Sequence, residues 1–125
     1  MILSSDYSEY LIAILFPWYI NDELKKHKYI MAKKYRSKIA SIVISHITLK
    51  TPIVLPTHLN EQLVKWFQSM PISVTAFQQE LDGFGAFHNT NNPVIFAKPI
   101  NIQRLRRLQK EIIYYLFYFL RSPLP

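Results

Sequence analysis

The chain has 125 residues, of which 50% are hydrophobic and 18% are charged, so it is long enough for one hydrophobic core and too apolar for a disordered chain. Fifteen Lys and Arg residues against eight Asp and Glu residues give a net charge of +7. This charge favours polyanionic partners without establishing one. The absence of cysteine excludes disulfides, thiolate metal sites and cysteine nucleophiles, and a reducing cytoplasm is the expected location.

Neither the N-terminus nor the apolar runs indicate a membrane protein. The start, MILSSDYSEY, lacks the positive charge that precedes the apolar core of a secretory signal. The longest apolar run, residues 112–120, is shorter than the roughly 20 residues that cross a bilayer. We therefore expect a soluble protein with no membrane partner.

The first third of the chain alternates between strand and helix patterns. Residues 11–16 (LIAILF) form an apolar run that Pro17 stops, which predicts a central strand. Apolar residues recur at helical spacing from Ile20 onward among many lysines, which predicts a basic amphipathic helix. Residues 39–50 are rich in β-branched side chains and predict a strand that ends before Pro52.

A second helix is expected after Thr57, which can cap its N-terminus, and before Pro71, which would stop it. Its core stripe would consist of Leu59, Leu63, Trp66, Phe67 and Met70. Residues 72–87 are expected to be extended. The chain's only glycines, Gly83 and Gly85 of the DGFG stretch, would allow a bulge or a close approach of the backbone.

The last elements are a strand over residues 94–98 and a helix that Asn101 would cap. The apolar side of this helix would carry Ile102, Leu105, Leu108 and Ile112, and its other sides Arg104, Arg106, Arg107 and Lys110. After Glu111 the tail is apolar on all sides, which a surface helix should not be. Either another surface covers the tail, or the natural sequence was lost there by truncation or frameshift.

The predicted order of elements is β, α, β, α, β, β, α, which indicates an α/β or α+β class with helices packed on sheets. A weak internal repeat relates LIAILFPWYINDELKKH, residues 11–27, to PVIFAKPINIQRLRRLQ, residues 93–109. The first copy leads into the strand that carries His46. At the same spacing, the equivalent position in the second copy would fall just beyond Pro125.

The stretch SHITLKTP, residues 45–52, places His46 and Thr48 two positions apart in a strand, so both project from one face. Threonine can donate a hydrogen bond to a phosphate oxygen, and histidine can take or give a proton near neutral pH. Cleaving a phosphodiester requires such proton transfers to and from the reacting oxygens. The alternative interpretation of His46 is a core histidine with satisfied hydrogen bonds.

Together with GFGAF and NPVIFAKP downstream, SHITLKTP resembles the two-histidine phosphoesterase superfamily, which includes the 2′-5′ RNA ligases and cyclic phosphodiesterases; the resemblance spans about residues 10–108. It implies a bilobal α/β (α+β) fold with helices packed on mixed sheets, and a His-x-Thr motif in each lobe facing a shared cleft. It also implies catalysis by His46 and Thr48, phosphate binding by Thr48, and no metal or other cofactor. The implied substrates are RNA ends, 2′,3′-cyclic phosphates or related cyclic nucleotides.

Only one motif matches where the resemblance requires two. His88-Asn89-Thr90 is a second literal match, but it lies in the turn-like HNTNNP and is interpreted as a decoy. We therefore expect residues 1–125 to be a single truncated 2′-5′ RNA ligase-like domain with its C-terminal part missing, weakly active or inactive. The alternatives are a non-catalytic RNA- or protein-binding module on the same scaffold, or a non-functional fragment.

The remaining features receive structural interpretations. His27 is expected to pack at a helix border and His58 to lie on the surface, and the four histidines do not form a metal-ligand set. The basic helix faces are interpreted as solvated surfaces rather than as an RNA-binding surface. The sequence shows no set of aromatic residues that would stack on bases, and Trp66 and Phe67 are assigned to packing. An unpaired sheet edge and the apolar tail predict either a homodimer through that edge or aggregation.

Overall fold

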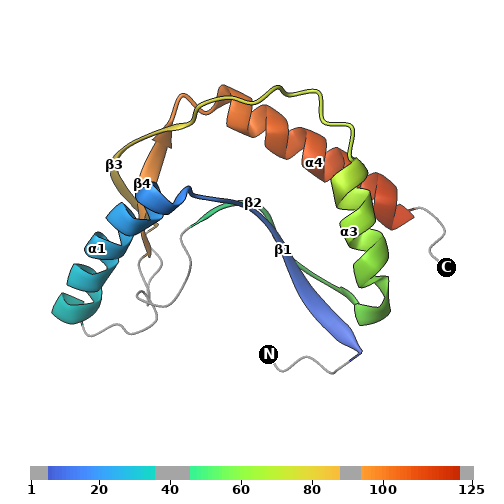
Figure 1. The fold of residues 1–125 in the computed structure, drawn as a ribbon, viewed down its shortest axis with the longest axis horizontal. Coiled ribbons are helices and arrows are strands. Elements are labelled where there is room, and N and C mark those ends of the chain that lie inside the picture. Colours follow the sequence, from blue (N-terminus) through green and yellow to red (C-terminus); the bar gives the residue numbers. More distant parts are fainter. Residues whose placement is uncertain (1–5, 36–45, 88–93, 122–125) are drawn as a thin grey trace. The chain divides into compact units, whose positions relative to one another are not determined.

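The fold is known from a computed structural model that describes residues 6–35, 46–87 and 94–121 (Figure 1). Its elements are β1 (Tyr7–Leu15), α1 (Trp18–Tyr35), β2 (His46–Pro56), the 3₁₀ turn η1 (Thr57–Leu59), α3 (Asn60–Ser69), β3 (Glu80–Phe87), β4 (Val94–Ile100) and α4 (Gln103–Arg121). The predicted order of strands and helices is confirmed, and the class is α+β. The chain divides into two compact units, residues 1–60 and 61–125.

The first unit contains the antiparallel pair β1–β2, which runs from Tyr7 opposite Pro56 to Leu15 opposite His46. The prediction that the second strand ends before Pro52 is wrong, because β2 continues to Pro56. Pro52 falls where the register shifts, between the pairs Tyr10–Ile53 and Ile12–Lys50. A bulge interrupts the ladder of hydrogen bonds, so the missing amide hydrogen of proline is tolerated there.

Polar contacts fasten the far end of this pair to the turn that follows it. The amide of Thr57 donates to the carbonyl of Asp6 at 2.8 Å, and the hydroxyls of Thr57 and Ser8 share a hydrogen bond of 2.8 Å. The expected N-cap role of Thr57 is wrong: Thr57 is the first residue of the 3₁₀ turn, and no side chain caps that turn. The Thr57 hydroxyl bonds to Ser8 instead.

Helix α1 begins directly after Pro17, whose carbonyl accepts a hydrogen bond of 3.0 Å from the amide of Asn21. Ile20 and Leu24 are half-buried, as a core-facing stripe requires. His27 is exposed, so the expectation that it packs at a helix border is wrong. Burial lowers the pKa of the half-buried Lys28, and the nearby charge of Lys25 adds to this effect.

The second unit contains the antiparallel pair β3–β4, whose register shifts between Leu81 and Phe84. Gly83 lies in this shift with a φ of 70°, a conformation that side chains disfavour. Gly85 lies opposite Phe96, and a Cβ atom on Gly85 would come within 2.5 Å of that ring. The predictions of a bulge and of a close backbone approach in DGFG are therefore both confirmed.

The expected mixed sheets are wrong for the described strands, since each of the two sheets is an antiparallel pair. Strands β3 and β4 follow one another with a short connection, and a short connection can join only antiparallel neighbours. The β1–β2 pair is antiparallel although α1 lies between its strands in the sequence. Its direction is therefore a property of the fold that the order of elements did not determine.

Helices α3 and α4 of the second unit meet at the C-terminal part of α4 (Figure 1). The buried residues of the two helices are Leu63, Leu105, Ile112 and Leu116. The ring of Trp66 stacks on that of Phe119, with centroids 5.1 Å apart. The packing role expected for Trp66 is thus confirmed, whereas Phe67 is 47% exposed and that expectation was wrong.

Two polar details fix how α4 begins and what it holds. The Ile102 carbonyl accepts a hydrogen bond of 2.8 Å from the amide of Arg106, so Ile102 rather than Asn101 occupies the N-cap position. Further along, the Glu111 carboxylate accepts hydrogen bonds from the Ser73 hydroxyl and amide and from the Val74 amide. The Ser73 hydroxyl is the main cause of a lowered pKa of Glu111. Glu111 therefore ties the segment after α3 to α4.

Candidate functional site

His46 and Thr48 stand at the beginning of β2, paired with Leu15 and Ala13 of β1. Because they are two positions apart in a strand, their side chains share one face of the sheet, and those of Ile47 and Leu49 point to the other. Leu49 is only 5% exposed, whereas Thr48 is exposed and His46 is half-buried. Thr48 and Leu49 thus differ clearly in exposure, whereas His46 and Ile47 are both half-buried.

The face that carries His46 and Thr48 is partly exposed at this end of the sheet. Residues directly opposite in an antiparallel pair project to the same side, so Leu15 and Ala13 flank the two candidate residues. Leu15 is 65% exposed, and the side chain of alanine is short. A ligand could thus approach the imidazole and the hydroxyl from the same side of the strand.

The strand becomes irregular immediately after Thr48. The register shifts between the pairs Ala13–Thr48 and Ile12–Lys50, so β2 gains a residue there. The alternation that joins His46 to Thr48 consequently does not extend to Lys50. The Lys50 ammonium bonds instead to the carbonyl and hydroxyl oxygens of Thr51, at 3.3 and 3.1 Å.

The other described histidines lie on other elements. His58 is exposed on η1, as expected for a surface residue, and ten strand positions of roughly 3.3 Å each separate the start of β2 from its end. His27 is exposed on α1. His88 and Thr90 lie outside the described residues, so their interpretation as a decoy stays a prediction.

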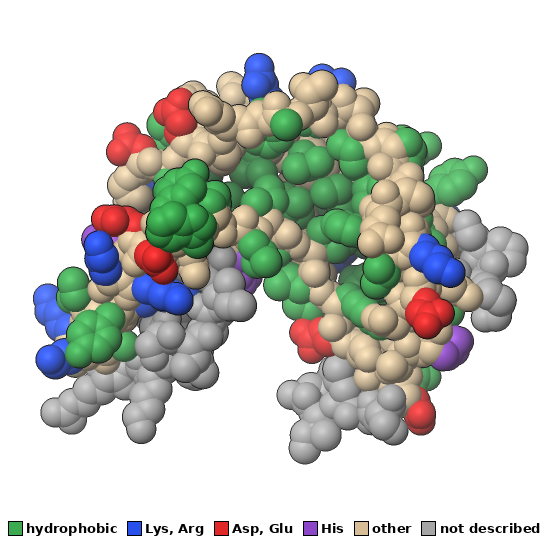
Figure 2. All heavy atoms as spheres, viewed as in Figure 1, with side chains coloured by type: hydrophobic (Ala, Val, Ile, Leu, Met, Phe, Trp, Pro, Cys, Tyr) green, Lys and Arg blue, Asp and Glu red, His purple; other side chains and the backbone are tan. Residues whose placement is uncertain are grey.

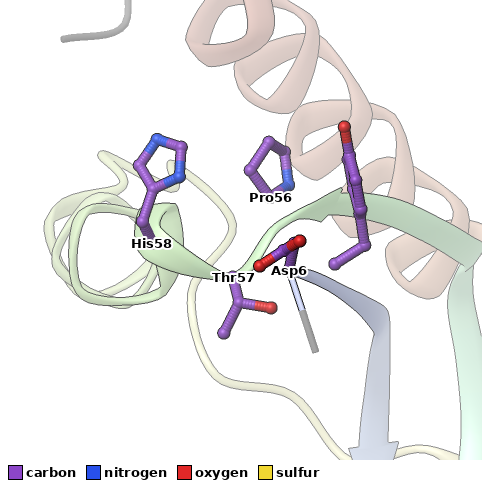
Figure 3. Close-up of a pocket in the computed structure, with 5 residues that line it drawn as sticks. Asp6, Pro56, Thr57 and His58 are labelled. Atoms are coloured by element: carbon purple, nitrogen blue, oxygen red, sulfur yellow. The ribbon is translucent and has the colours of Figure 1, made fainter. Parts of the chain in front are cut away.

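A surface depression exists in the first unit, but it lies at the other end of β1–β2. Its lining consists of Asp6, Tyr7, Pro56, Thr57 and His58 (Figure 3). Tyr7 pairs with Pro56 at the end of the ladder opposite to the Leu15–His46 pair. This depression therefore belongs to the junction of the strands with η1 and not to the His46–Thr48 face.

The described parts of the chain contain neither a metal-ligand cluster nor a membrane-spanning helix. Among residues 6–35, 46–87 and 94–121, no group of three His, Cys, Asp or Glu side chains could hold a metal ion. In the same ranges, no helix has the length and apolar character needed to cross a membrane. The chemistry suggested by the described face of β2 is that of an imidazole and a hydroxyl beside an anion.

The neighbours of the motif could not be found from the sequence. The spacing of His46 and Thr48 and the β-branched residues around them were sufficient to predict that both lie on one face of a strand. The position of Leu15 and Ala13 beside them depends on the register of β1 against β2. This register contains two irregularities. No local pattern in either strand marks those partners.

Comparison with known proteins supports one assignment. No curated protein and no solved structure matches the chain. A protein-family model, that of the 2′-5′ RNA ligase superfamily, matches residues 21–115, which include the whole of β2 with His46 and Thr48. Because this match covers well over half of the 125 residues, the resemblance inferred from SHITLKTP is confirmed, and the chain belongs to the 2′-5′ RNA ligase superfamily of two-histidine phosphoesterases.

Proposed function

We propose that the chain acts on RNA ends or cyclic nucleotides as a 2′,3′-cyclic phosphodiesterase or 2′-5′ RNA ligase, with His46 and Thr48 as its catalytic residues. The superfamily supports a two-histidine phosphoesterase-like function with an RNA or nucleotide substrate. The observation that carries the proposal is the position of both residues two apart in β2, with Thr48 exposed, His46 half-buried and the intervening pattern ending in the buried Leu49.

The roles follow from the chemistry of opening a cyclic phosphate. A water oxygen forms a bond to phosphorus, and the bond from phosphorus to the 2′ or 3′ oxygen breaks. The water loses a proton, and the departing oxygen gains one. The His46 imidazole would carry out one of these proton transfers, and the Thr48 hydroxyl would donate a hydrogen bond to a phosphate oxygen. Thr48 would thus also be the phosphate-binding residue.

The activity expected from residues 1–125 is low. Among the residues that the structure describes, His46 is the one histidine on a strand, and it supplies one acid–base group, so the other proton transfer would fall to solvent. Losing one such group typically lowers a rate by about 100- to 10,000-fold. Purified protein should therefore open a 2′,3′-cyclic nucleotide slowly.

The test compares two variants of the site with two matched controls. The substitutions His46→Ala and Thr48→Ala should abolish the residual opening of a 2′,3′-cyclic nucleotide. His58→Ala removes an exposed histidine, and Thr51→Ala an exposed threonine of the same strand; both should leave the activity unchanged.

Two results would contradict the proposal. Equal loss of activity in His46→Ala and His58→Ala would mean that the measured rate does not come from the β2 face. Alternatively, full activity in both site variants would show that His46 has a structural and not a catalytic role. A purely binding module would show no turnover in any variant, while a cyclic nucleotide or phosphate would still shift the His46 ring resonances in an NMR titration.

Three further features stay predictions. They are the organisation of residues 1–125 as one truncated domain, a cytoplasmic location, and a homodimer. Each sheet of the described residues has two strands, and the outer edge of such a strand can pair with another chain. Sedimentation over a range of protein concentrations measures whether the mass doubles.

A further inference from the structure

Helix α4 exposes a row of cationic and aromatic side chains that the motif on β2 does not involve. Arg107, Lys110, Tyr114, Tyr118 and Arg121 follow one another at intervals of three or four residues, so they lie on one side of the helix. All five are exposed, and Tyr114 and Tyr118 keep 62% and 68% of their surface accessible. We call these five residues the outer stripe of α4.

The other residues of α4 explain why the outer stripe faces away from the interior of the protein. Leu105, Ile112 and Leu116 are buried, so the apolar side of α4 is already covered by other parts of the protein. Glu111 is the only acidic residue of α4, and its carboxylate accepts hydrogen bonds from Ser73 and Val74. The outer stripe itself therefore carries three positive charges and no negative charge. In Figure 2, Lys and Arg side chains are visible over the first turns of α4.

The two tyrosine rings are arranged as neighbours along the helix. The centroids of Tyr114 and Tyr118 are 6.5 Å apart, with an angle of 34° between the ring planes. The outer stripe spans 14 helical steps from Arg107 to Arg121, which is about 21 Å at 1.5 Å per residue. Cations thus precede and follow a pair of exposed rings along one extended surface.

We propose that the outer stripe of α4 binds single-stranded RNA, with its cations contacting phosphates and Tyr114 and Tyr118 stacking on bases. The three exposed cations outnumber the one carboxylate near them, that of Glu111, whose pKa the charge of Arg107 helps to lower, and an excess of positive charge complements a polyanion. Exposed aromatic rings offer a stacking surface to bases, which are accessible in single strands and covered in a duplex. This inference extends the proposed function to a second surface, because neither His46 nor Thr48 belongs to α4.

Charge and burial argue against two other occupants. A second copy of the same stripe would bring like charges together, which opposes a symmetric dimer through this surface. A membrane-surface helix inserts its apolar side into the lipid, but the apolar side of α4 is buried in the protein. Single-stranded RNA uses both the charges and the rings.

Sequence reasoning missed this surface because the tail is apolar on all sides. In the sequence, Tyr114 and Tyr118 cannot be told apart from the neighbouring Ile112 and Leu116. The structure separates them, since Leu116 is 1% exposed and the two tyrosines are mostly accessible. The expectation that the basic helix faces are solvated stays a prediction, and the proposed RNA-binding surface is its alternative for α4.

The experiment measures the affinity of the full chain for a fluorescent 12-nucleotide single-stranded RNA by anisotropy, over a series of salt concentrations, with a duplex of equal length alongside. The double variant Tyr114→Ser/Tyr118→Ser should bind the single strand at least about tenfold more weakly. The loss of one stacked base typically weakens the affinity by about fivefold or more, and two rings are removed. The variant Arg107→Gln/Lys110→Gln should reduce the salt slope by about 1.4, because each phosphate contact contributes about 0.7 for single strands.

Matched controls lie on α1, in the other unit. Tyr19→Ser/Tyr29→Ser removes two tyrosines that are 58% and 64% exposed. Lys33→Gln/Lys34→Gln removes two exposed charges. Both controls should bind RNA within about twofold of the original chain, a spread that an error of a few tenths of a kcal/mol in the binding free energy would produce. Both α4 variants should still open a 2′,3′-cyclic nucleotide at the original rate, which separates this proposal from the one about β2.

Several outcomes would overturn the inference. Equal losses in the α1 and α4 variants would indicate diffuse attraction by the net charge. Tighter binding of the duplex than of the single strand would exclude base stacking. A halving of the sedimenting mass in the tyrosine variant, without a change in RNA affinity, would assign the surface to a dimer, and binding to anionic lipid vesicles instead of RNA would assign it to a membrane.

Discussion

Replacing Leu116 by alanine tests which side of α4 faces the core. Leu116 is 1% exposed, the lowest value in the described core, and lies near the C-terminal end of the helix. Shortening a fully buried leucine removes its contacts and leaves a cavity, at a typical cost of about 2–5 kcal/mol in the free energy of unfolding. We therefore expect Leu116→Ala to lower the midpoint of thermal unfolding by about 10 °C or more.

The adjacent Phe117 is the matched control, because it is larger than leucine but 51% exposed. Truncating a half-exposed ring should cost only about 1 kcal/mol, since full burial of such a side chain contributes about 1.5–3 kcal/mol. Urea unfolding followed by far-UV circular dichroism measures both changes. If Phe117→Ala cost as much as Leu116→Ala, the orientation of α4 would be wrong, and the outer stripe of α4 would not be the accessible side of the helix.

Two other predictions concern the second unit. Because hydrogen bonds from Ser73 lower the pKa of Glu111 in the folded chain, the stabilisation present above the unfolded pKa of about 4.3 should be lost as the pH falls through the folded value. Urea unfolding measured between about pH 7 and pH 3 should then show a smaller loss of stability in Glu111→Gln than in the original chain. The control Glu61→Gln removes an equal but exposed charge of α3, and its stability should fall with pH as much as that of the original chain. Gly83→Ala should lower the free energy of unfolding by about 1–2 kcal/mol because Gly83 has a φ of 70°; an unchanged urea midpoint would show that the bulge relaxes at no cost.

Local patterns in the sequence were sufficient for the order of elements and for the motif. The β-branched run around His46 predicted its strand, and the period of two placed His46 and Thr48 on one face of it. The DGFG stretch predicted the irregularity of β3, because glycine adopts a positive φ without strain. In each case the cause lies in the residue itself or in its nearest neighbours along the chain.

Patterns of burial were predicted less well where several apolar residues follow one another. Trp66 and Phe67 are consecutive aromatic residues of α3, yet Trp66 stacks on Phe119 and Phe67 is 47% exposed. Hydrophobicity alone assigned both to the core. Their difference arises from a residue distant in the sequence, Phe119 of α4, whose ring stacks on that of Trp66.

What the sequence determined by itself was therefore the set of elements, the family and the candidate pair His46 and Thr48, because periodicity, glycine geometry and a short motif are local properties. The tertiary structure alone decided the antiparallel register of β1 against β2, the continuation of β2 through Pro52, and the exposure of Tyr114 and Tyr118. Each of these depends on which distant segment pairs with or covers a residue. Such partners are selected by the packing of the whole unit, and no single segment encodes them.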